Sequence, residues 1–222
     1  MNLNTKQVCL ANHASPVDDR LHEMASIRGE SLLMREFTHR VVNDWSSAIS
    51  AVSLAARRSD DPQVKSALGV VIDRLYRHAQ LFRALQMPQS GAAMDAAEHL
   101  ERLCLAVSES KLDSMNIRLV LAADPVAMSP DRCWRLGMIV MELVTNAARH
   151  AFQGRDDGTI RVDLFRAGER TECRVTDNGS APKKIRPGNG LTIVKDLAVS
   201  LGGTIKHQFG RHGSAAILKF AA

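Results

Sequence analysis

The stretch R-E-F-T-H-R-V-V-N-D-W, residues 35–45, gathers an acid, a histidine, an arginine and an asparagine on one predicted helix. At about 100° per residue, His39 faces away from the apolar stripe of that helix and should be exposed. An exposed imidazole held at one nitrogen can attack a phosphorus atom through the other. Glu36 could orient the ring or accept its proton, and Arg40 and Asn43 could anchor a phosphate. By itself, this pattern also fits an ordinary surface histidine.

A second polar set lies about 100 residues further along, on a predicted long helix. Glu142, Asn146, Arg149 and His150 have spacings that place them on one face. A polar face of this kind is often only a solvated one. The sharper interpretation is a phosphate and metal face, because an asparagine oxygen is a ligand for Mg²⁺ and an arginine neutralises phosphate.

Glycines and one acid follow this helix in a fixed order. Asp177 ends a predicted strand, and its carboxylate could accept a hydrogen bond from an amino group. Gly179 in the next turn permits positive φ and lets a flat ring approach the backbone. Gly188 and Gly190 precede a predicted helix, where free amides form an anion cradle. Gly213, in a later turn, is a further candidate for close approach.

The elements that position His39 form a predicted helical hairpin over residues 26–90, after a weakly patterned leader at 1–25. Asp61 should cap the second helix, and Pro62 suits its first position. A lone hairpin leaves much of its apolar surface in water. We favour burial of that surface in a four-helix bundle with a second copy of the chain; the alternative is packing on the C-terminal half of the same chain. The apolar stripes are Leu33, Phe37, Val41, Trp45, Ile49 and Val52, then Val64, Leu68, Val71, Leu75, Ala79 and Phe82.

Residues 91–222 have a different pattern, in which helices are set apart from runs of strands. This arrangement predicts an α+β sandwich with one helical layer on a mixed sheet, and the boundary with the hairpin falls at Pro88–Gly91. We expect helices at 92–107, 130–152 and 191–201, and strands at 116–122, 158–166, 171–177, 204–209 and 214–220.

The order of these motifs resembles the GHKL ATPase family over roughly residues 93–220. Histidine-kinase members of that family carry an N box similar to E-L-V-T-N-A-A-R-H-A-F, followed by three glycine boxes. E-F-T-H-R-V-V-N-D is similar to the E-x-x-H-R-x-x-N signature of the HWE-like histidine kinases, and R-L-x-R-H-x-x-L in the second helix matches their dimerisation and phosphotransfer hairpin. The resemblance therefore implies such a hairpin followed by a GHKL (Bergerat) α/β sandwich.

The resemblance also implies roles for the site residues. Asn146 would hold Mg²⁺, Glu142 would assist at the attacking group, and Arg149 and His150 would contact the phosphates of ATP. Asp177 would accept a hydrogen bond from the adenine amino group. The glycines that would lie beside the nucleotide are Gly179, Gly188, Gly190 and Gly213.

The function implied is that of a two-component histidine kinase. It would transfer the γ-phosphoryl group of ATP to His39 and then to an aspartate of a response-regulator receiver domain. The alternative is a histidine phosphotransferase with a degenerate ATP site. Ala181 in the last place of the first glycine box, and the short S-A-P-K-K-I-R-P lid, favour this alternative. A GHKL serine kinase or anti-sigma factor would need no phosphoacceptor histidine. About 25 residues before the hairpin are too few for a sensor domain, so we expect the signal to come from a partner.

The amino-acid composition excludes several classes of protein. The apolar fraction of 45% supports a sizeable core, and no apolar run is long enough for a signal peptide or a membrane span. The four cysteines are far apart, which argues against zinc and disulfides and favours a reducing, cytoplasmic location. The net charge of +5 is scattered without interleaved aromatics, so a nucleic-acid partner is not expected.

Overall fold

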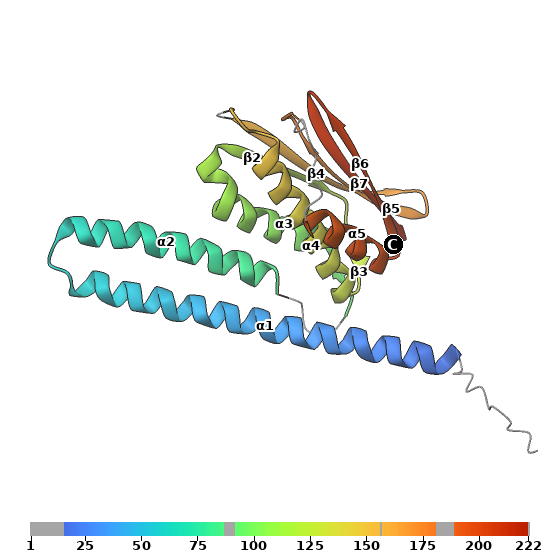
Figure 1. Cartoon of the computed structure of the whole chain (residues 1–222), viewed down its shortest axis with the longest axis horizontal. Helices are drawn as coiled ribbons and strands as arrows, with labels where there is room; N and C mark the ends of the chain where they lie inside the picture. Colours follow the sequence, from blue (N-terminus) through green and yellow to red (C-terminus); the bar gives the residue numbers. More distant parts are fainter. Residues whose placement is uncertain (1–15, 87–91, 156, 181–188, 222) are drawn as a thin grey trace, which may run out of the picture.

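The computed structural model consists of a long helical hairpin beside an α/β sandwich (Figure 1). This arrangement confirms the fold class that the sequence predicts. No helix among the described residues is long and apolar enough to cross a membrane. The structure describes residues 16–86, 92–155, 157–180 and 189–221, without the side chains of 16–35, 37 and 189.

The hairpin is formed by α1 (Pro16–Arg58) and α2 (Pro62–Ala84). Because α1 already begins at Pro16, the expectation of an unpatterned leader is wrong for residues 16–25; residues 1–15 lie outside the described part. The Asp61 carboxylate accepts a hydrogen bond from the Gln63 amide at 2.7 Å and so caps α2, as predicted.

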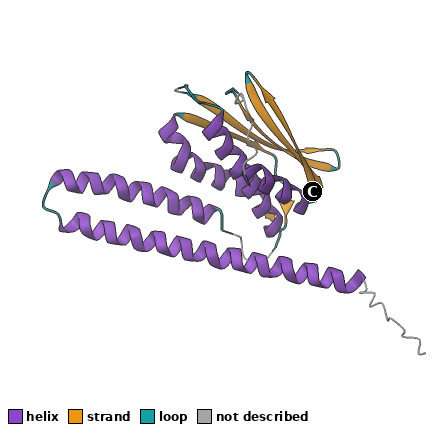
Figure 2. Cartoon of the chain, viewed as in Figure 1, coloured by secondary structure: helices purple, strands orange, loops and turns teal. Residues whose placement is uncertain are grey.

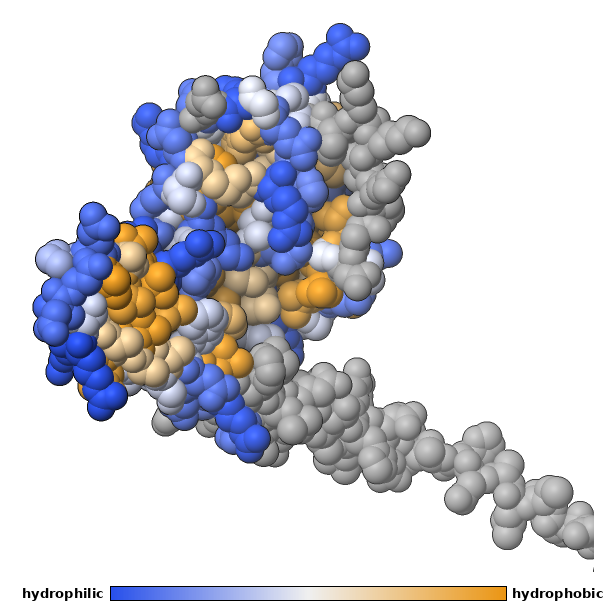
Figure 3. All heavy atoms as spheres, turned by 60° about the vertical axis from the view of Figure 1, so that its left-hand side comes forward, coloured by the Kyte–Doolittle hydropathy of each residue, from blue (hydrophilic) through white to orange (hydrophobic). Residues whose placement is uncertain are grey.

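The apolar side chains of the hairpin are buried at one end and exposed at the other. Near the sandwich, Ala79 and Leu81 are buried, and the indole Nε1 of Trp134 donates a hydrogen bond to the Leu85 carbonyl at 3.0 Å. Towards the turn between α1 and α2, apolar side chains stay exposed (Figure 3), among them Leu54, Val64, Val70, Val71 and Tyr76 at 41–68%. Packing on the same chain therefore covers one end only, and the four-helix bundle stays a prediction.

The sandwich has one mixed, five-stranded sheet in the order β2-β4-β5-β7-β6. The edge strand β2 runs parallel to β4, and the other neighbouring pairs are antiparallel. The strands are β2 (Ile117–Ala123), β4 (Gly158–Ala167), β5 (Arg170–Asp177), β6 (Gly203–Gly210) and β7 (Gly213–Ala221).

One layer of helices covers one face of this sheet (Figure 2). It contains α3 (Ala96–Val107), α4 (Pro130–His150) and α5 (Asn189–Ser200). A π-turn, η1 (Ser108–Leu112), and a 3₁₀ turn, η2 (Asp113–Met115), connect α3 to the sheet. The core between the layers is mostly aliphatic. Its fully buried side chains include Leu100, Leu103, Leu136, Ile139, Ile160, Leu164, Leu218 and Phe220.

The helix expected from residue 92 begins only at Ala96. The short strand β1 (Met94–Asp95) pairs with β3 (Ala127–Met128) instead. The Asp95 carboxylate explains the difference, because it accepts hydrogen bonds from the amides of Ala97 at 2.9 Å and Val126 at 3.0 Å. The Asp95 side chain thus caps α3 and also holds β1 to the segment that precedes β3.

His99 on α3 is buried where α3 crosses α4. A Cβ atom at Gly137 would lie 2.6 Å from His99 Nε2, so the glycine gives the ring its space. Burial, and secondarily the charge of Arg102, lower the pKa of His99 to about 4. The ring is therefore neutral in the folded protein at neutral pH.

This pKa predicts acid sensitivity. In the unfolded chain His99 binds a proton below about pH 6.5, whereas in the folded protein it does so only near pH 4. The free energy of unfolding should therefore fall by about 3 kcal/mol as the pH is lowered from about 6.5 to 4. Urea unfolding at pH 7, 5 and 4 measures the loss, which His99→Gln should reduce. Exposed His212→Gln is the control and should behave as wild type. An unchanged acid dependence in His99→Gln would contradict the assignment.

Candidate functional site

The polar face of α4 meets the start of α5. Asn146 Nδ2 donates a hydrogen bond to Glu142 Oε1 at 3.2 Å, which leaves the Asn146 amide oxygen available as an acceptor. A Cβ atom at Gly190 would lie 2.0 Å from Glu142 Oε1 and 3.4 Å from Asn146 Nδ2. Without a Cβ atom, Gly190 lets the Glu142 carboxylate and the Asn146 amide lie directly against the start of α5. Carboxylate and amide oxygens are the ligands that Mg²⁺ prefers.

Two candidate phosphate-binding residues end the same helix. Arg149 and His150 are exposed in the last turn of α4, and neither forms an ion pair with another described residue. Gly190 is the second residue of α5 rather than a residue before it, so the helix begins slightly earlier than predicted. Gly188 and Ala181 lie outside the described residues.

Asp177 is the last residue of β5, as predicted, and its side chain is held by two neighbouring turns. Its Oδ1 accepts hydrogen bonds from the amides of Gly179 at 3.0 Å and Ser214 at 3.3 Å. Burial raises the pKa of the Asp177 carboxyl, and the hydrogen bonds from Gly179 and Ser214 oppose that rise. Sequence reasoning missed Ser214, although it directly follows the glycine that was singled out.

Two glycines bring the backbones of this region together. A Cβ atom at Gly179 would lie 2.2 Å from the Ala151 carbonyl oxygen, which also accepts a hydrogen bond from the Ser180 amide at 2.9 Å. Gly179 has no positive φ, so the expected reason for this glycine is wrong; close packing against the end of α4 requires it. Gly213 does have a positive φ of 137°, and a Cβ there would lie 2.2 Å from the Asp177 carbonyl oxygen.

Asn178 fixes the same turn to the neighbouring strand and was not singled out from the sequence. Its Oδ1 accepts a hydrogen bond from the Thr159 amide at 2.8 Å, and its carbonyl accepts one from Arg155 Nη1 at 2.8 Å. An asparagine in a D-N-G turn is the signal that could have identified it, because its side chain readily satisfies backbone groups.

The hairpin histidine is accessible, as predicted: His39 is exposed on α1. Glu36 does not bond to the imidazole; its Oε1 pairs with Arg40 Nε at 2.9 Å, with both side chains more than half exposed. An exposed pair of this kind contributes little stability, so Glu36 can be released to another partner at small cost. Among the described residues, none makes a hydrogen bond to the His39 ring.

The arrangement on the sandwich suits a nucleotide. A partly buried carboxylate can accept a hydrogen bond from a base amino group. The amide oxygen of an asparagine can hold a metal ion, and an exposed arginine and an exposed histidine can contact phosphates. These groups belong to Asp177, to Asn146 with Gly190, and to Arg149 with His150.

Comparison with known proteins agrees with this geometry. A family model described as "Histidine kinase-like ATPase domain" matches residues 77–213, and one described as "Histidine kinase" matches residues 36–111. Blue-light-activated histidine kinase 2 of Erythrobacter litoralis is 26% identical over 196 residues, which are 82% of this chain and 54% of that protein. Sensor histidine kinase PdtaS of Mycolicibacterium smegmatis is also 26% identical over 196 residues, which are 84% of this chain and 39% of that protein.

The solved structures share the fold. The histidine kinase domain of a blue-light activated histidine kinase from Erythrobacter litoralis superposes with a TM-score of 0.56 at 20% identity, over 79% of this chain and 95% of that one. The chain spans about half or less of the length of the curated relatives it matches. With both family models matched in order along the sequence, the chain belongs to the HWE-type histidine kinases, in which a histidine kinase hairpin precedes a histidine kinase-like ATPase domain.

Proposed function

We propose that this chain is an ATP-dependent protein histidine kinase that phosphorylates His39. The observation that carries the proposal is that one sandwich holds both the partly buried Asp177 carboxylate and the Asn146–Gly190 contact, in a chain whose matched hairpin exposes His39. A nucleotide site and an accessible nucleophile are the two parts that such a reaction needs.

The residues divide the task of holding ATP. The Asp177 carboxylate accepts the adenine amino hydrogen, and Gly179 and Gly213 keep the backbone close around it. Arg149 and His150 contact the phosphates, together with the backbone near Gly188 and Gly190. Mg²⁺, held by the Asn146 oxygen, would supply charge neutralisation across the phosphate oxygens.

The transfer is a substitution at phosphorus. The unprotonated imidazole nitrogen of His39 forms the new N–P bond while the bond between the γ-phosphorus and the β,γ-bridging oxygen breaks, and ADP leaves with that electron pair. The proton on the other ring nitrogen is then lost to a base. Glu142 lies beside the proposed phosphate site and Glu36 lies one helical turn from His39; these are the candidate acceptors.

The phosphoryl group then passes to an aspartate of a response-regulator receiver domain docked on the hairpin. Support comes from the exposure of His39, Arg40 and Asn43 on one length of α1, where a partner carboxylate and phosphoryl group could be contacted. A phosphotransferase that receives its phosphoryl group from another protein would use the same surface. The two functions differ in one respect, namely whether His39 receives its phosphoryl group directly from ATP.

Labelling with γ-labelled ATP and Mg²⁺ tests the kinase proposal. Wild type should acquire acid-labile label, and His39→Ala and Asn146→Ala should reduce it at least about 100-fold, since the first lacks the acceptor and the second the metal ligand. Ser50→Ala, an exposed change on the same helix, is the control. Label retained in His39→Ala would refute the phosphoacceptor; an unlabelled wild type that binds no nucleotide by calorimetry would favour the phosphotransferase.

Asp177→Asn separates base recognition from folding. The asparagine oxygen can still accept from the amides of Gly179 and Ser214, but its NH₂ group faces the adenine amino group with a donor. We expect affinity for ATP to fall about 10- to 100-fold and the preference for ATP over GTP to shrink, while the melting temperature does not fall, because burial already disfavours the charged carboxyl. Unchanged preference between the two nucleotides would contradict the role of Asp177.

We also propose that the exposed apolar end of the hairpin pairs with a second copy in a four-helix bundle. Val64 and Val71 belong to the apolar stripe of α2 yet are 41% and 44% exposed, which is the surface that a partner hairpin would cover. Val71→Glu should therefore give monomers in sedimentation, whereas Val199→Glu, at a 66% exposed site on α5, should not. A wild-type monomer at micromolar concentration would contradict the bundle.

A further inference from the structure

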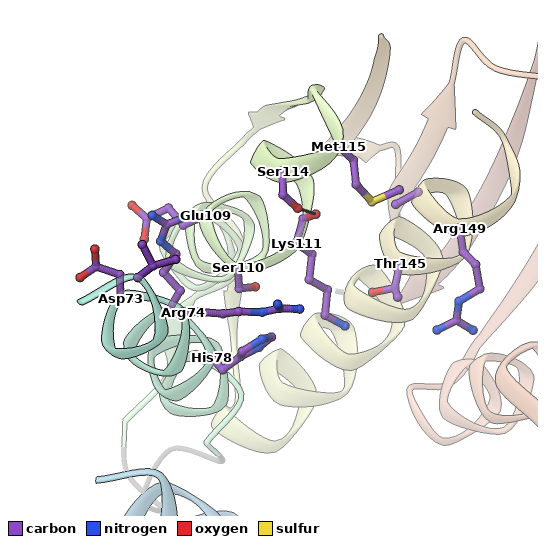
Figure 4. A pocket seen from close by; sticks show the side chains of 13 residues that line it. Asp73, Arg74, His78, Glu109, Ser110, Lys111, Ser114, Met115, Thr145 and Arg149 are labelled. Atoms are coloured by element: carbon purple, nitrogen blue, oxygen red, sulfur yellow. Dashed lines mark hydrogen bonds between the residues drawn. The ribbon is translucent and has the colours of Figure 1, made fainter. Parts of the chain in front are cut away.

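A groove of about 710 Å³ lies between α2 and the sandwich (Figure 4) and shares only Arg149 with the residues of the proposed nucleotide site. Its walls come from α2, from the η1 and η2 turns, and from the last two turns of α4. A volume of this size accommodates a small-molecule ligand. Most of the wall residues are polar or charged.

Positive charge concentrates in this groove. Arg74 and Arg77 line it from α2, Lys111 from η1, and Arg149 from α4. None of the four forms an ion pair with any residue that the structure describes. Two acids also line the groove, Asp73 and Glu109, but Figure 4 shows their carboxylates turned outwards, away from Lys111. The interior of the groove therefore holds cations that no acid compensates.

The polar groups converge at the centre of the groove. In Figure 4, Arg74 and His78 point from α2 towards the Lys111 ammonium group, and the Thr145 hydroxyl points towards the same space from α4. Thr145 Oγ1 is buried and has no hydrogen-bond partner within the described part of the chain. A buried hydroxyl without a partner is unfavourable, and a ligand oxygen in the groove would satisfy it.

The pKa of His78 depends on the electrostatic potential in the groove. Its ring stacks on Trp45 with a centroid distance of 5.7 Å. Burial lowers the pKa of His78, and the charges of Arg74 and Lys111 lower it further. The other charged groups that line the groove around His78 are Asp73, Arg77, Glu109 and Arg149. A bound anion would offset the two nearby cations and raise this pKa.

We propose that this groove binds a small ligand carrying at least two phosphate groups, held between the hairpin and the ATPase domain. Four cations from three separate elements line the groove, which is more positive charge than one phosphate neutralises, and arginine and threonine side chains suit phosphate oxygens. Apart from Arg149, the site is distinct from the nucleotide face. At about 100° per residue, Thr145 lies about 60° and Ala148 about 120° around α4 from Glu142, on the side away from Asn146.

The test follows His78 in the full chain, labelled with ¹⁵N-histidine, by NMR near pH 6, with inorganic pyrophosphate as the probe and no nucleotide present. We expect a saturable shift of the His78 ring signals towards the protonated form. Lys111→Gln and Arg74→Gln should each weaken pyrophosphate binding about tenfold or more. The control Lys206→Gln removes an exposed cation on β6 that does not line the groove, and it should leave the binding unchanged.

A parallel titration of His150→Gln keeps this proposal separate from the proposed kinase activity, because His150 is a proposed phosphate contact of the nucleotide site and does not line the groove. Pyrophosphate binding that persists in this variant supports a second site, whether or not ATP is bound elsewhere. Loss of the signal in His150→Gln would mean that the anion occupies the nucleotide site, and would overturn the proposal. The proposal would also be overturned if the wild type showed no saturable shift, or if the shift were undiminished in Lys111→Gln. A response only to a hexaglutamate peptide would overturn it as well and would assign the groove to an acidic protein partner.

Discussion

The close approach of the D-N-G-S turn to the end of α4 is the contact on which the nucleotide site depends. The Ala151 carbonyl accepts the Ser180 amide, and Gly179 lies so close to that carbonyl that any side chain would collide with it. This contact sets the distance between the strand that ends at Asp177 and the helix that carries Asn146. The residues proposed to recognise the base and to bind the phosphates are thus positioned by a backbone contact that neither residue makes itself.

A second constraint joins the hairpin to the sandwich. Leu81 belongs to the same apolar core as the helices of the ATPase domain, and the Trp134 indole holds the carbonyl that follows α2. These contacts lie at one end of α2 only, so the rest of the hairpin projects beyond the domain (Figure 1). The result is a junction between the hairpin, whose helix α1 exposes His39, and the sandwich, with a charged groove between α2 and the sandwich.

Much of this structure could be predicted because its elements repeat with a clear period or carry an explicit cap. The hairpin, the Asp61 cap and the strands of the sheet belong to this class. The start of α3 could not be predicted, because Asp95 bonds to an amide 31 residues away. The reason for Gly179 also depends on a distant neighbour, Ala151, rather than on its own φ. Lys111 was missed because a π-turn has no hydrophobic period to mark it.

Arg149 has a position with a consequence for regulation. It belongs to the phosphate-binding face of α4 implied by the family, and it also lines the groove beside α2. A single guanidinium cannot fully neutralise two polyanions at once, so ligands on its two sides would oppose each other. Thermodynamic linkage makes that opposition reciprocal: each would weaken the binding of the other by the same factor. Negative cooperativity between the nucleotide and the ligand of the groove would then need no conformational change, because both would share the charge of Arg149.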